Sequence, residues 1–246
     1  MAETETLLIT SAIAPPNGVS CLAMTDASLR KASTRASVLN WFTTKPRAIV
    51  IVDATNHMVM SNDDLQIADS LGIKVEQLAF AQNADEVRAK GKGIGEARLL
   101  QYAMQNSKML KEAESFFKVT GKLFVNNFQE VSTVIAANNL QSIFWRWADG
   151  TYNLFSEAID TRFYYCNTRF FQSDLLPALL ECDENNGRYM EKQAFHACTK
   201  SLSPGVAARP VITGHGGGGG TLYAVHHYGP LEQQFPCWFS VNGPKA

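Results

Sequence analysis

Hydrophobic positions in the first half of the chain form short continuous runs, separated by segments in which apolar residues recur at helical spacing. Strands are predicted at residues 7–13, 48–53, 75–80 and 116–125, and the first two runs are typical of strands that are buried within a sheet. Helices are predicted at residues 27–42, 61–72 and 96–111. Because right-handed crossovers make such strands parallel, the pattern predicts an α/β fold, with a Rossmann-like, mainly parallel sheet flanked by helices.

The first predicted helix has a cap and two distinct sides. Asp26 can cap it at its amino end. Its apolar side is expected to carry Leu29, Ala36, Leu39 and Phe42, and its polar side Arg30, Lys31 and Arg35. In the last apolar run, Gly121 is expected to interrupt the strand.

The second half of the chain has a less regular pattern. Strands are predicted at residues 143–147 and 163–166, and helices at 173–182 and 189–200. A chain of 246 residues is compatible with one domain. We therefore expect a single domain over residues 1–246, in which residues 128–246 cover one end of the sheet that residues 1–127 build.

The charge balance bears on the class of partner. The 22 basic residues nearly cancel the 23 acidic ones, so the chain lacks the positive excess that non-specific nucleic-acid binding requires. The amino terminus is acidic rather than basic, and no apolar run reaches the length of a membrane span. These features favour a cytoplasmic protein that does not bind nucleic acid. Peripheral contact with a membrane remains compatible with them.

The cysteines and histidines give no sign of a metal site. The cysteines, which are odd in number and form no Cys-x-x-Cys pair, are Cys21, Cys166, Cys182, Cys198 and Cys237. This spacing indicates reduced thiols rather than a disulfide framework or a zinc site. His226 and His227 are adjacent, so on a strand they point to opposite faces and cannot chelate one metal ion in the usual way.

Polar residues follow each of the four predicted strands, at the edge where an open α/β sheet binds its ligands. They are Thr10 and Ser11, then Asp53 and Asn56, then Gln82, and finally Lys118, Thr120 and Lys122. Caps and turns also require such residues, so a structural role is an alternative for any single strand. The whole set favours a binding site at this edge.

A glycine-rich stretch, residues 90–95, precedes the helix predicted from Glu96. Its backbone amides and the helix dipole could meet a phosphate. The stretch is neither a dinucleotide-binding fingerprint nor a Walker sequence. Glu96, expected in the first turn, would stabilise the helix whether or not it also held a ligand.

Lys118 is unexpected within an apolar strand, because burial of an unpaired ammonium is costly. Either the strand reaches the binding site at this residue, or Lys118 pairs with a carboxylate such as Asp53 or Glu96. We favour the binding site.

The second half offers Asp160, Arg162 and Glu191 as candidates for chemistry. A general base requires a positioned carboxylate, although an isolated glutamate on a helix more often forms a surface salt bridge. Trp145 and Trp147 could form a platform for a sugar, and an aromatic stripe of this kind is more often part of a core.

Four short segments in this order carry a resemblance to a known family. Residues 91–97, 117–125, 160–165 and 189–191 resemble the ordered landmarks of glycosyltransferase-like proteins of bacterial surface-polysaccharide biosynthesis. The resemblance implies a GT-A-like fold, in which residues 1–127 bind a nucleotide sugar and residues 128–246 bind a saccharide acceptor. It implies transfer of a sugar between the two.

The resemblance also implies roles for individual residues. Thr10 and Ser11 would contact the nucleotide, Asp53 the base or ribose, and Lys118 the phosphate. Further donor-binding residues would be Asn56, Gln82, Lys92, Gly95, Glu96, Arg98, Thr120 and Lys122. Asp160 and Arg162 would contact the acceptor, and Glu191 would deprotonate its hydroxyl.

Metal-dependent relatives carry an Asp-x-Asp where this chain has Lys118-x-Thr120, followed by Gly121 and Lys122. Because fixed positive charge can neutralise a leaving diphosphate, the substitution predicts transfer without a metal ion or other cofactor. The glycine run that begins at Gly216 would serve as a mobile lid. Two alternatives remain: a catalytically silent nucleotide- or sugar-binding module of a polysaccharide assembly complex, and another α/β enzyme that acts on sugar phosphates.

Overall fold

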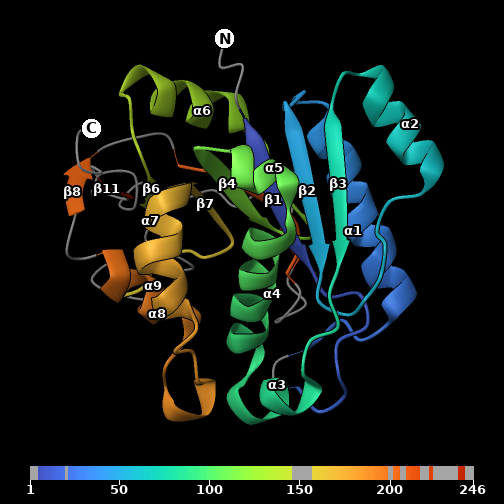
Figure 1. The fold of residues 1–246 in the computed structure, drawn as a ribbon, viewed down its shortest axis with the longest axis vertical. Coiled ribbons are helices and arrows are strands. Elements are labelled where there is room, and N and C mark those ends of the chain that lie inside the picture. Colours follow the sequence, from blue (N-terminus) through green and yellow to red (C-terminus); the bar gives the residue numbers. More distant parts are fainter. Residues whose placement is uncertain are drawn as a thin grey trace.

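The computed structural model describes residues 5–19, 22–145, 157–198, 202–205, 209–216, 222–223 and 238–241. Its main sheet has the strand order β3-β2-β1-β4-β7-β6-β11-β8 (Figure 1). The first four of these are parallel to one another: β1 (Thr6–Ser11), β2 (Ala48–Asp53), β3 (Lys74–Ala79) and β4 (Ser115–Thr120). The predicted α/β class with a mainly parallel sheet flanked by helices is confirmed.

The strands of the second half extend this sheet in the antiparallel sense. They are β6 (Ile143–Trp145), β7 (Phe163–Asn167), β8 (Leu202–Gly205) and β11 (Trp238–Val241). A second, three-stranded sheet contains β5 (Leu123–Val125), β9 (Ile212–His215) and β10 (Leu222–Tyr223). The expected interruption at Gly121 therefore separates two strands, β4 and β5, that belong to different sheets.

The helices lie on both faces of the main sheet (Figure 1). Those of the first half are α1 (Ala27–Phe42), α2 (Asn62–Ser70), α3 (Ala84–Lys90), α4 (Lys92–Asn106) and α5 (Lys108–Glu112). The second half contributes α6 (Phe128–Ala137), α7 (Thr168–Phe170), a π-helical turn (Phe171–Leu175), α8 (Leu176–Leu179), a 3₁₀ turn (Glu184–Asn186) and α9 (Met190–Cys198). No helix in the described residues is long and apolar enough to cross a membrane.

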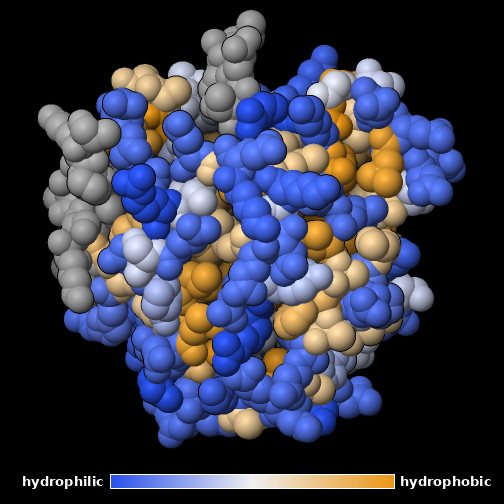
Figure 2. Space-filling view, in the orientation of Figure 1, coloured by the Kyte–Doolittle hydropathy of each residue, from blue (hydrophilic) through white to orange (hydrophobic). Residues whose placement is uncertain are grey.

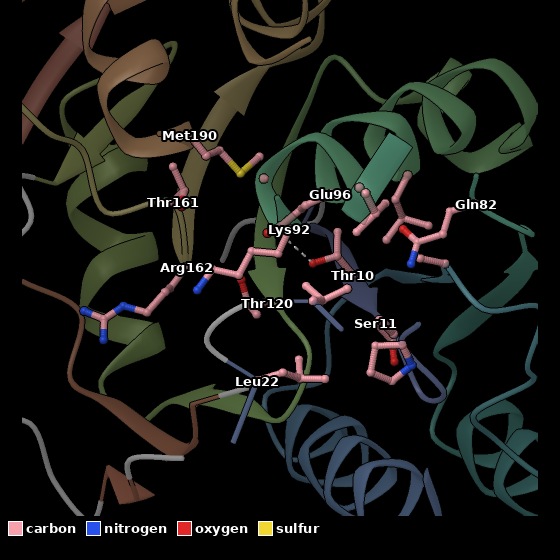
Figure 3. A pocket seen from close by; sticks show the side chains of 18 of the residues that line it. Thr10, Ser11, Leu22, Gln82, Lys92, Glu96, Thr120, Thr161, Arg162 and Met190 are labelled. Carbon is pink, nitrogen blue, oxygen red and sulfur yellow. Dashed lines mark hydrogen bonds between the residues drawn. The ribbon is translucent and has the colours of Figure 1, made fainter. Parts of the chain in front are cut away.

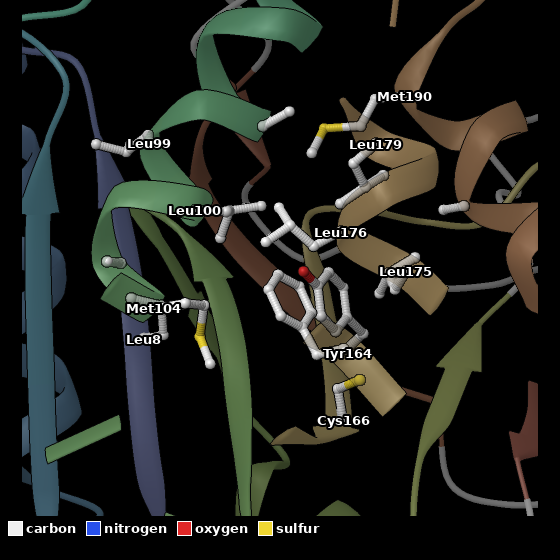
Figure 4. Close-up of a cluster of buried hydrophobic side chains, with 14 of the residues drawn as sticks. Leu8, Leu99, Leu100, Met104, Tyr164, Cys166, Leu175, Leu176, Leu179 and Met190 are labelled. Carbon is white, nitrogen blue, oxygen red and sulfur yellow. The ribbon is translucent and has the colours of Figure 1, made fainter. Parts of the chain in front are cut away.

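Strand alternation divides the core into two layers. Leu7 and Ile9 pack in one cluster with Trp41 of α1, whereas Leu8 packs in the other with Leu100 of α4. Figure 4 shows the second cluster, in which Leu100 lies together with Tyr164 of β7 and side chains of α8. Figure 2 shows polar side chains over most of the α4 face, with apolar side chains gathered between α4 and the α8–α9 region.

Several predicted boundaries were wrong. The glycine-rich stretch is not a turn, because α4 begins at Lys92 and includes Gly93 and Gly95. Helix α3 and helix α6 were not predicted. The expected helix over residues 173–182 begins earlier, at α7, and its middle turn is π-helical.

The apolar side predicted for α1 was also wrong, although its cap is correct. Asp26 accepts a hydrogen bond from the Leu29 amide at 2.7 Å. Leu29 itself is 53% exposed, and the buried residues of the helix are Arg30, Thr34, Ser37, Val38, Trp41 and Phe42. The helix thus buries an arginine toward the carboxyl ends of the strands.

Some predictions lie outside the described residues: those for Trp147, for His226 and His227, for Cys21 and Cys237, and for residues 217–220. Cys166, Cys182 and Cys198 lie within them as buried free thiols.

Candidate functional site

A cavity of about 440 Å³ opens at the carboxyl ends of β1 and β4. Helix α4 and the amino-terminal end of α9 also contribute to its walls. Figure 3 shows Thr10, Ser11 and Gln82 on one side of this pocket, and Thr161, Arg162 and Met190 on the other. A volume of this size falls within the range of small-molecule sites.

Most of the predicted site residues line the pocket. They are Thr10, Ser11, Gln82, Lys92, Gly95, Glu96, Thr120, Lys122, Arg162 and Glu191. The others, Asp53, Asn56, Arg98, Lys118 and Asp160, are not among its lining residues.

Lys118 lies directly behind the pocket wall and is completely buried. Its Nζ is 2.5 Å from Glu96 Oε1, and it donates hydrogen bonds to Thr120 Oγ1 at 2.8 Å and to the Thr161 carbonyl at 2.6 Å. These three acceptors match the three N–H groups of the Lys118 ammonium, so none of them is left for another partner. The geometry therefore favours the alternative in which Lys118 pairs with a carboxylate, here Glu96, over the alternative that we had favoured, in which it faces the binding site. Direct contact of Lys118 with phosphate stays a prediction.

Strand parity explains this pairing. Phe116 faces the α4 side of the sheet and Phe117 faces the opposite side, so Lys118 faces α4 again. Glu96 lies one turn into α4 rather than in the first turn as predicted, and it also accepts a hydrogen bond from Thr10 Oγ1 at 3.0 Å. Glu96 thus connects the ends of β1 and β4 across the pocket wall (Figure 3).

Asp53 shapes loops and does not line the pocket. Its carboxylate, which is fully buried, accepts hydrogen bonds from the Ile13 amide at 2.9 Å, the Thr55 amide at 2.8 Å and the Thr55 hydroxyl at 2.6 Å. Asn56 follows in a left-handed conformation with φ of 61°. Neither residue lines the pocket, and the donor contacts predicted for both stay predictions.

Arg98 also lies away from the pocket. Its guanidinium pairs with Glu86 of α3, with Nη2 3.0 Å from Oε1 and Nε 3.2 Å from Oε2. The side chain of Arg98 is directed toward α3 and does not line the pocket, so its predicted donor contact stays a prediction.

The amino terminus of α4 already holds a carboxylate. Glu184 Oε1 accepts a hydrogen bond from the Gly93 amide at 2.9 Å. Gly91 has φ of 95°, and a Cβ added there would clash with the Glu184 side chain, which explains the need for glycine. The position where we expected a phosphate is therefore filled by Glu184, a residue that the sequence pattern did not single out.

Lys122 is the predicted cation that does face the pocket. It is 5% exposed, and its side chain has no hydrogen bond or ion pair with any residue that the structure describes. Its pKa is lowered to about 8, mainly by burial and secondly by the nearby Arg30 guanidinium, against the opposing charges of Glu96 and Asp53.

Arg30 is a lining residue that we had placed on the polar side of α1. It is 4% exposed, and its guanidinium donates to the carbonyls of Ala12 at 2.6 Å and Met24 at 2.8 Å. No carboxylate of the described residues lies within ion-pair distance of it. Counting back from Trp41 in helical steps, through Val38 and Thr34, would have placed Arg30 on the buried face.

On the opposite wall, Asp160 and Arg162 form a closed pair. Arg162 Nε and Nη2 donate to the two Asp160 oxygens at 2.8 and 2.6 Å. Asp160 is buried behind the wall, whereas Arg162 lines the pocket. Asp160 thus acts on the pocket through Arg162, and a direct acceptor contact of Asp160 is not supported by this geometry.

Glu191, in the first turn of α9, is the candidate base. Burial is the main cause that raises the pKa of its carboxyl, and the charges of Glu96 and Asp160 raise it further, whereas Lys92 lowers it. Its Oε1 accepts a hydrogen bond from Thr161 Oγ1 at 3.3 Å. A pocket carboxylate with raised proton affinity can take a proton from a bound hydroxyl.

Two further observations concern this wall of the pocket. Gly216, where the glycine run begins, lines the cavity. Among the described residues, no group of three or more His, Cys, Asp or Glu side chains is arranged to hold a metal ion.

No protein family model matches the chain, and no curated protein matches it. Among solved structures, it is similar to HddC from Yersinia pseudotuberculosis, with 9% identity and a TM-score of 0.39 over 71% of this chain and 86% of the other. It is similar to core-mannan synthase A from Aspergillus fumigatus in an Mn/GDP form, with 11% identity and a TM-score of 0.38 over 80% and 69%. A glycosyltransferase involved in glycosylation of the major capsid of PBCV-1 has 11% identity and a TM-score of 0.41 over 77% and 74%.

Proposed function

We propose that this protein transfers a sugar from a nucleotide-sugar donor to a hydroxyl of a saccharide acceptor, without a metal ion. One observation carries the proposal: the same pocket contains a buried ammonium whose side chain has no partner among the described residues, Lys122, and a half-buried carboxylate with a raised pKa, Glu191. A group transfer of this kind requires both a cation for the leaving anion and a base for the attacking hydroxyl.

The chemistry assigns one step to each group. The acceptor oxygen forms a bond to the anomeric carbon, and the bond from that carbon to the donor diphosphate breaks. Glu191 takes the acceptor proton, and Lys122 stabilises the negative charge that develops on the departing diphosphate. Glu96 lies between the two ends of the pocket, held in place by Lys118 and Thr10.

The two walls of the pocket suit the two substrates. Thr10, Ser11 and Gln82 stand at strand ends on the donor side (Figure 3). Thr161 and Arg162 stand opposite, beside Glu191, and provide hydrogen-bonding groups for a saccharide. Lys118 and Thr120 occupy the strand end where an Asp-x-Asp would hold a metal ion, which is why we assign charge neutralisation to protein cations.

The test is turnover with nucleotide sugars and oligosaccharides, measured as release of nucleoside diphosphate on addition of acceptor. We expect Glu191→Gln to lower kcat by at least about 100-fold, while donor binding is retained, because loss of a general base affects the chemical step. Glu181→Gln, on an exposed residue, is the control. Excess chelator should leave the wild-type rate unchanged.

Three results would contradict the proposal. Acceptor-independent donor hydrolysis would indicate a hydrolase, and donor binding without turnover would indicate a silent binding module. Activity that chelator abolishes and manganese restores would refute the metal-independent mechanism.

A further inference from the structure

Arg30 and Lys122 are two buried cations in the same pocket, close enough for each to disfavour the charge of the other. Neither has an ion pair within the described ranges. Arg30 comes from α1 and Lys122 from the turn between β4 and β5, so the fold brings them together from distant parts of the chain. The carboxylates of Glu96 and Asp53 offset part of this positive charge from a distance, and an anionic ligand between the two cations would balance the rest.

Lys122 carries three energetic costs at one position. Its side chain is desolvated and has no counter-ion among the described residues, and its backbone has φ of 72°, a left-handed conformation unfavourable for a residue other than glycine. The backbone is held in place by neighbours: the Gly121 amide donates to the Thr10 carbonyl at 2.6 Å, and the His215 amide to the Lys122 carbonyl at 3.2 Å. Strain and buried charge concentrated in this way are typical of a functional residue.

Ser11 adds an uncharged group at the same end of β1. It is 5% exposed and lines the pocket, and its buried hydroxyl has no hydrogen-bond partner in the part of the chain that the structure describes. A buried hydroxyl without a partner costs free energy that a ligand oxygen could recover.

We propose that Arg30, Lys122 and Ser11 form the seat of the two phosphoryl groups of a nucleoside diphosphate. The identification of this ligand rests on the proposed function, whereas the seat follows from the cations and the hydroxyl themselves. Arg30 is fixed by the carbonyls of Ala12 and Met24, so its remaining N–H groups are oriented before the ligand arrives. We leave the amino terminus of α4 out of the seat, because Glu184 already accepts a hydrogen bond from the Gly93 amide there.

The seat has a distinctive dependence on pH. A bound diphosphate would stabilise the charged form of Lys122, whose pKa in the free protein is about 8. The phosphate of the ligand itself titrates near 6. Between pH 7.5 and 9.5 the ligand charge is thus constant, and affinity should fall as Lys122 loses its proton.

The experiment is calorimetric titration of the full chain with UDP and GDP in excess chelator, at several values of pH between 7.5 and 9.5. Lys122→Met removes the charge but keeps a side chain of similar length and the same left-handed backbone conformation. Its matched control is Lys45→Met, because Lys45 is an exposed lysine that also has a left-handed backbone, with φ of 50°. Inorganic pyrophosphate, titrated alongside, separates recognition of the diphosphate from recognition of the nucleoside.

We expect Lys122→Met to weaken binding of the diphosphate by about 10- to 100-fold at pH 7.5, the range for a charge-assisted hydrogen bond, and to abolish the loss of affinity toward pH 9.5. Lys45→Met should bind as the wild type does. Lys122→Met should also melt at a higher temperature than the wild type without ligand, which a purely structural lysine would not do. Arg30→Lys, which keeps the charge, should bind more tightly than Arg30→Met.

Equal affinity of Lys122→Met and wild type for UDP, GDP and pyrophosphate would overturn the seat. Such a result would remove the role proposed for Lys122 in transfer, whereas sugar transfer itself is tested separately by release of nucleoside diphosphate on addition of acceptor. Conversely, Lys122-dependent diphosphate binding without any transfer to an acceptor would support the seat and contradict the proposed function.

Discussion

The ion pair between Glu96 and Lys118 leads to an asymmetric prediction about stability. The Lys118 side chain is 0% exposed, whereas that of Glu96 is 26% exposed. Glu96→Gln leaves a fully buried ammonium with only neutral acceptors. Lys118→Met leaves a carboxylate that water can still reach and that Thr10 still contacts. Removal of the acid should therefore cost more than removal of the base.

The magnitudes follow from these surroundings. Removal of one partner of a buried pair costs roughly 3–5 kcal/mol, and the access of water to this pair favours the lower end, about 3 kcal/mol for Glu96→Gln. For Lys118→Met we expect about 1–2 kcal/mol, because two neutral acceptors, Thr120 Oγ1 and the Thr161 carbonyl, each lose the hydrogen bond that the ammonium donates. In a chain of this length, about 3 kcal/mol lowers the melting temperature by roughly 6–12 °C.

Urea unfolding of both single variants and of the double variant at pH 7.5 tests this reasoning. The double variant should be more stable than the sum of the single effects predicts, by about 1–3 kcal/mol, since it removes both charges together. Strict additivity would refute the coupling. A greater loss for Lys118→Met than for Glu96→Gln would refute the argument from burial.

Two further changes probe the turn that carries Lys122. Gly121→Ala places a Cβ 2.5 Å from the Thr10 carbonyl oxygen, so we expect the free energy of unfolding in urea to fall by about 1–3 kcal/mol. Gly72→Ala, the control, should cost less, because a Cβ there meets nothing within 4 Å and only the positive φ is unfavourable. For Lys122 itself, the folded pKa of about 8 lies below the ordinary value of 10.5. Between these two pH values the unfolded chain therefore binds more protons than the folded protein does. Wild-type stability should rise with pH across this window, by on the order of 3 kcal/mol in total. Lys122→Met should show no such rise, and a rise equal to that of the wild type would contradict the assignment.

Strands β1 and β2 were predictable because each contains a continuous apolar run and is buried over its whole length. Strand β3 was also predicted, although it is only partly buried. The position of the pocket was predictable as well, since parallel strands end at one edge. The second half was less predictable, because its strands join the sheet in the antiparallel sense through contacts between residues far apart in the chain. The pairing of β7 with β4 joins Phe163 to Val119, for example, and no local pattern encodes it.

The helix-borne charges were the main source of error. Arg98 and Arg30 both lie on helices that border the pocket, and sequence spacing favoured Arg98 because it follows the glycine-rich stretch. The Arg98 guanidinium pairs with the Glu86 carboxylate of α3, which neutralises its charge at the surface. Arg30 lies on the buried face of α1, the face that also carries Trp41. The sequence would have predicted this face only if the position of one large aromatic residue had counted for more than the positions of several smaller apolar residues.

Lys118 and Lys122 show that a charged residue in an apolar segment predicts a buried charge but does not predict whether that charge has a structural or a ligand-binding role. Both are buried at the carboxyl end of one strand, and the sequence around them gives no reason to separate them. What separates them is the side of the chain that they face. Strand parity directs Lys118 to Glu96, whereas the left-handed turn after Gly121 directs Lys122 to the pocket, beside another cation. The buried lysine without a partner among the described residues is therefore the one whose charge remains for a ligand to neutralise, and its partnered neighbour serves to hold the wall in which that ligand would lie.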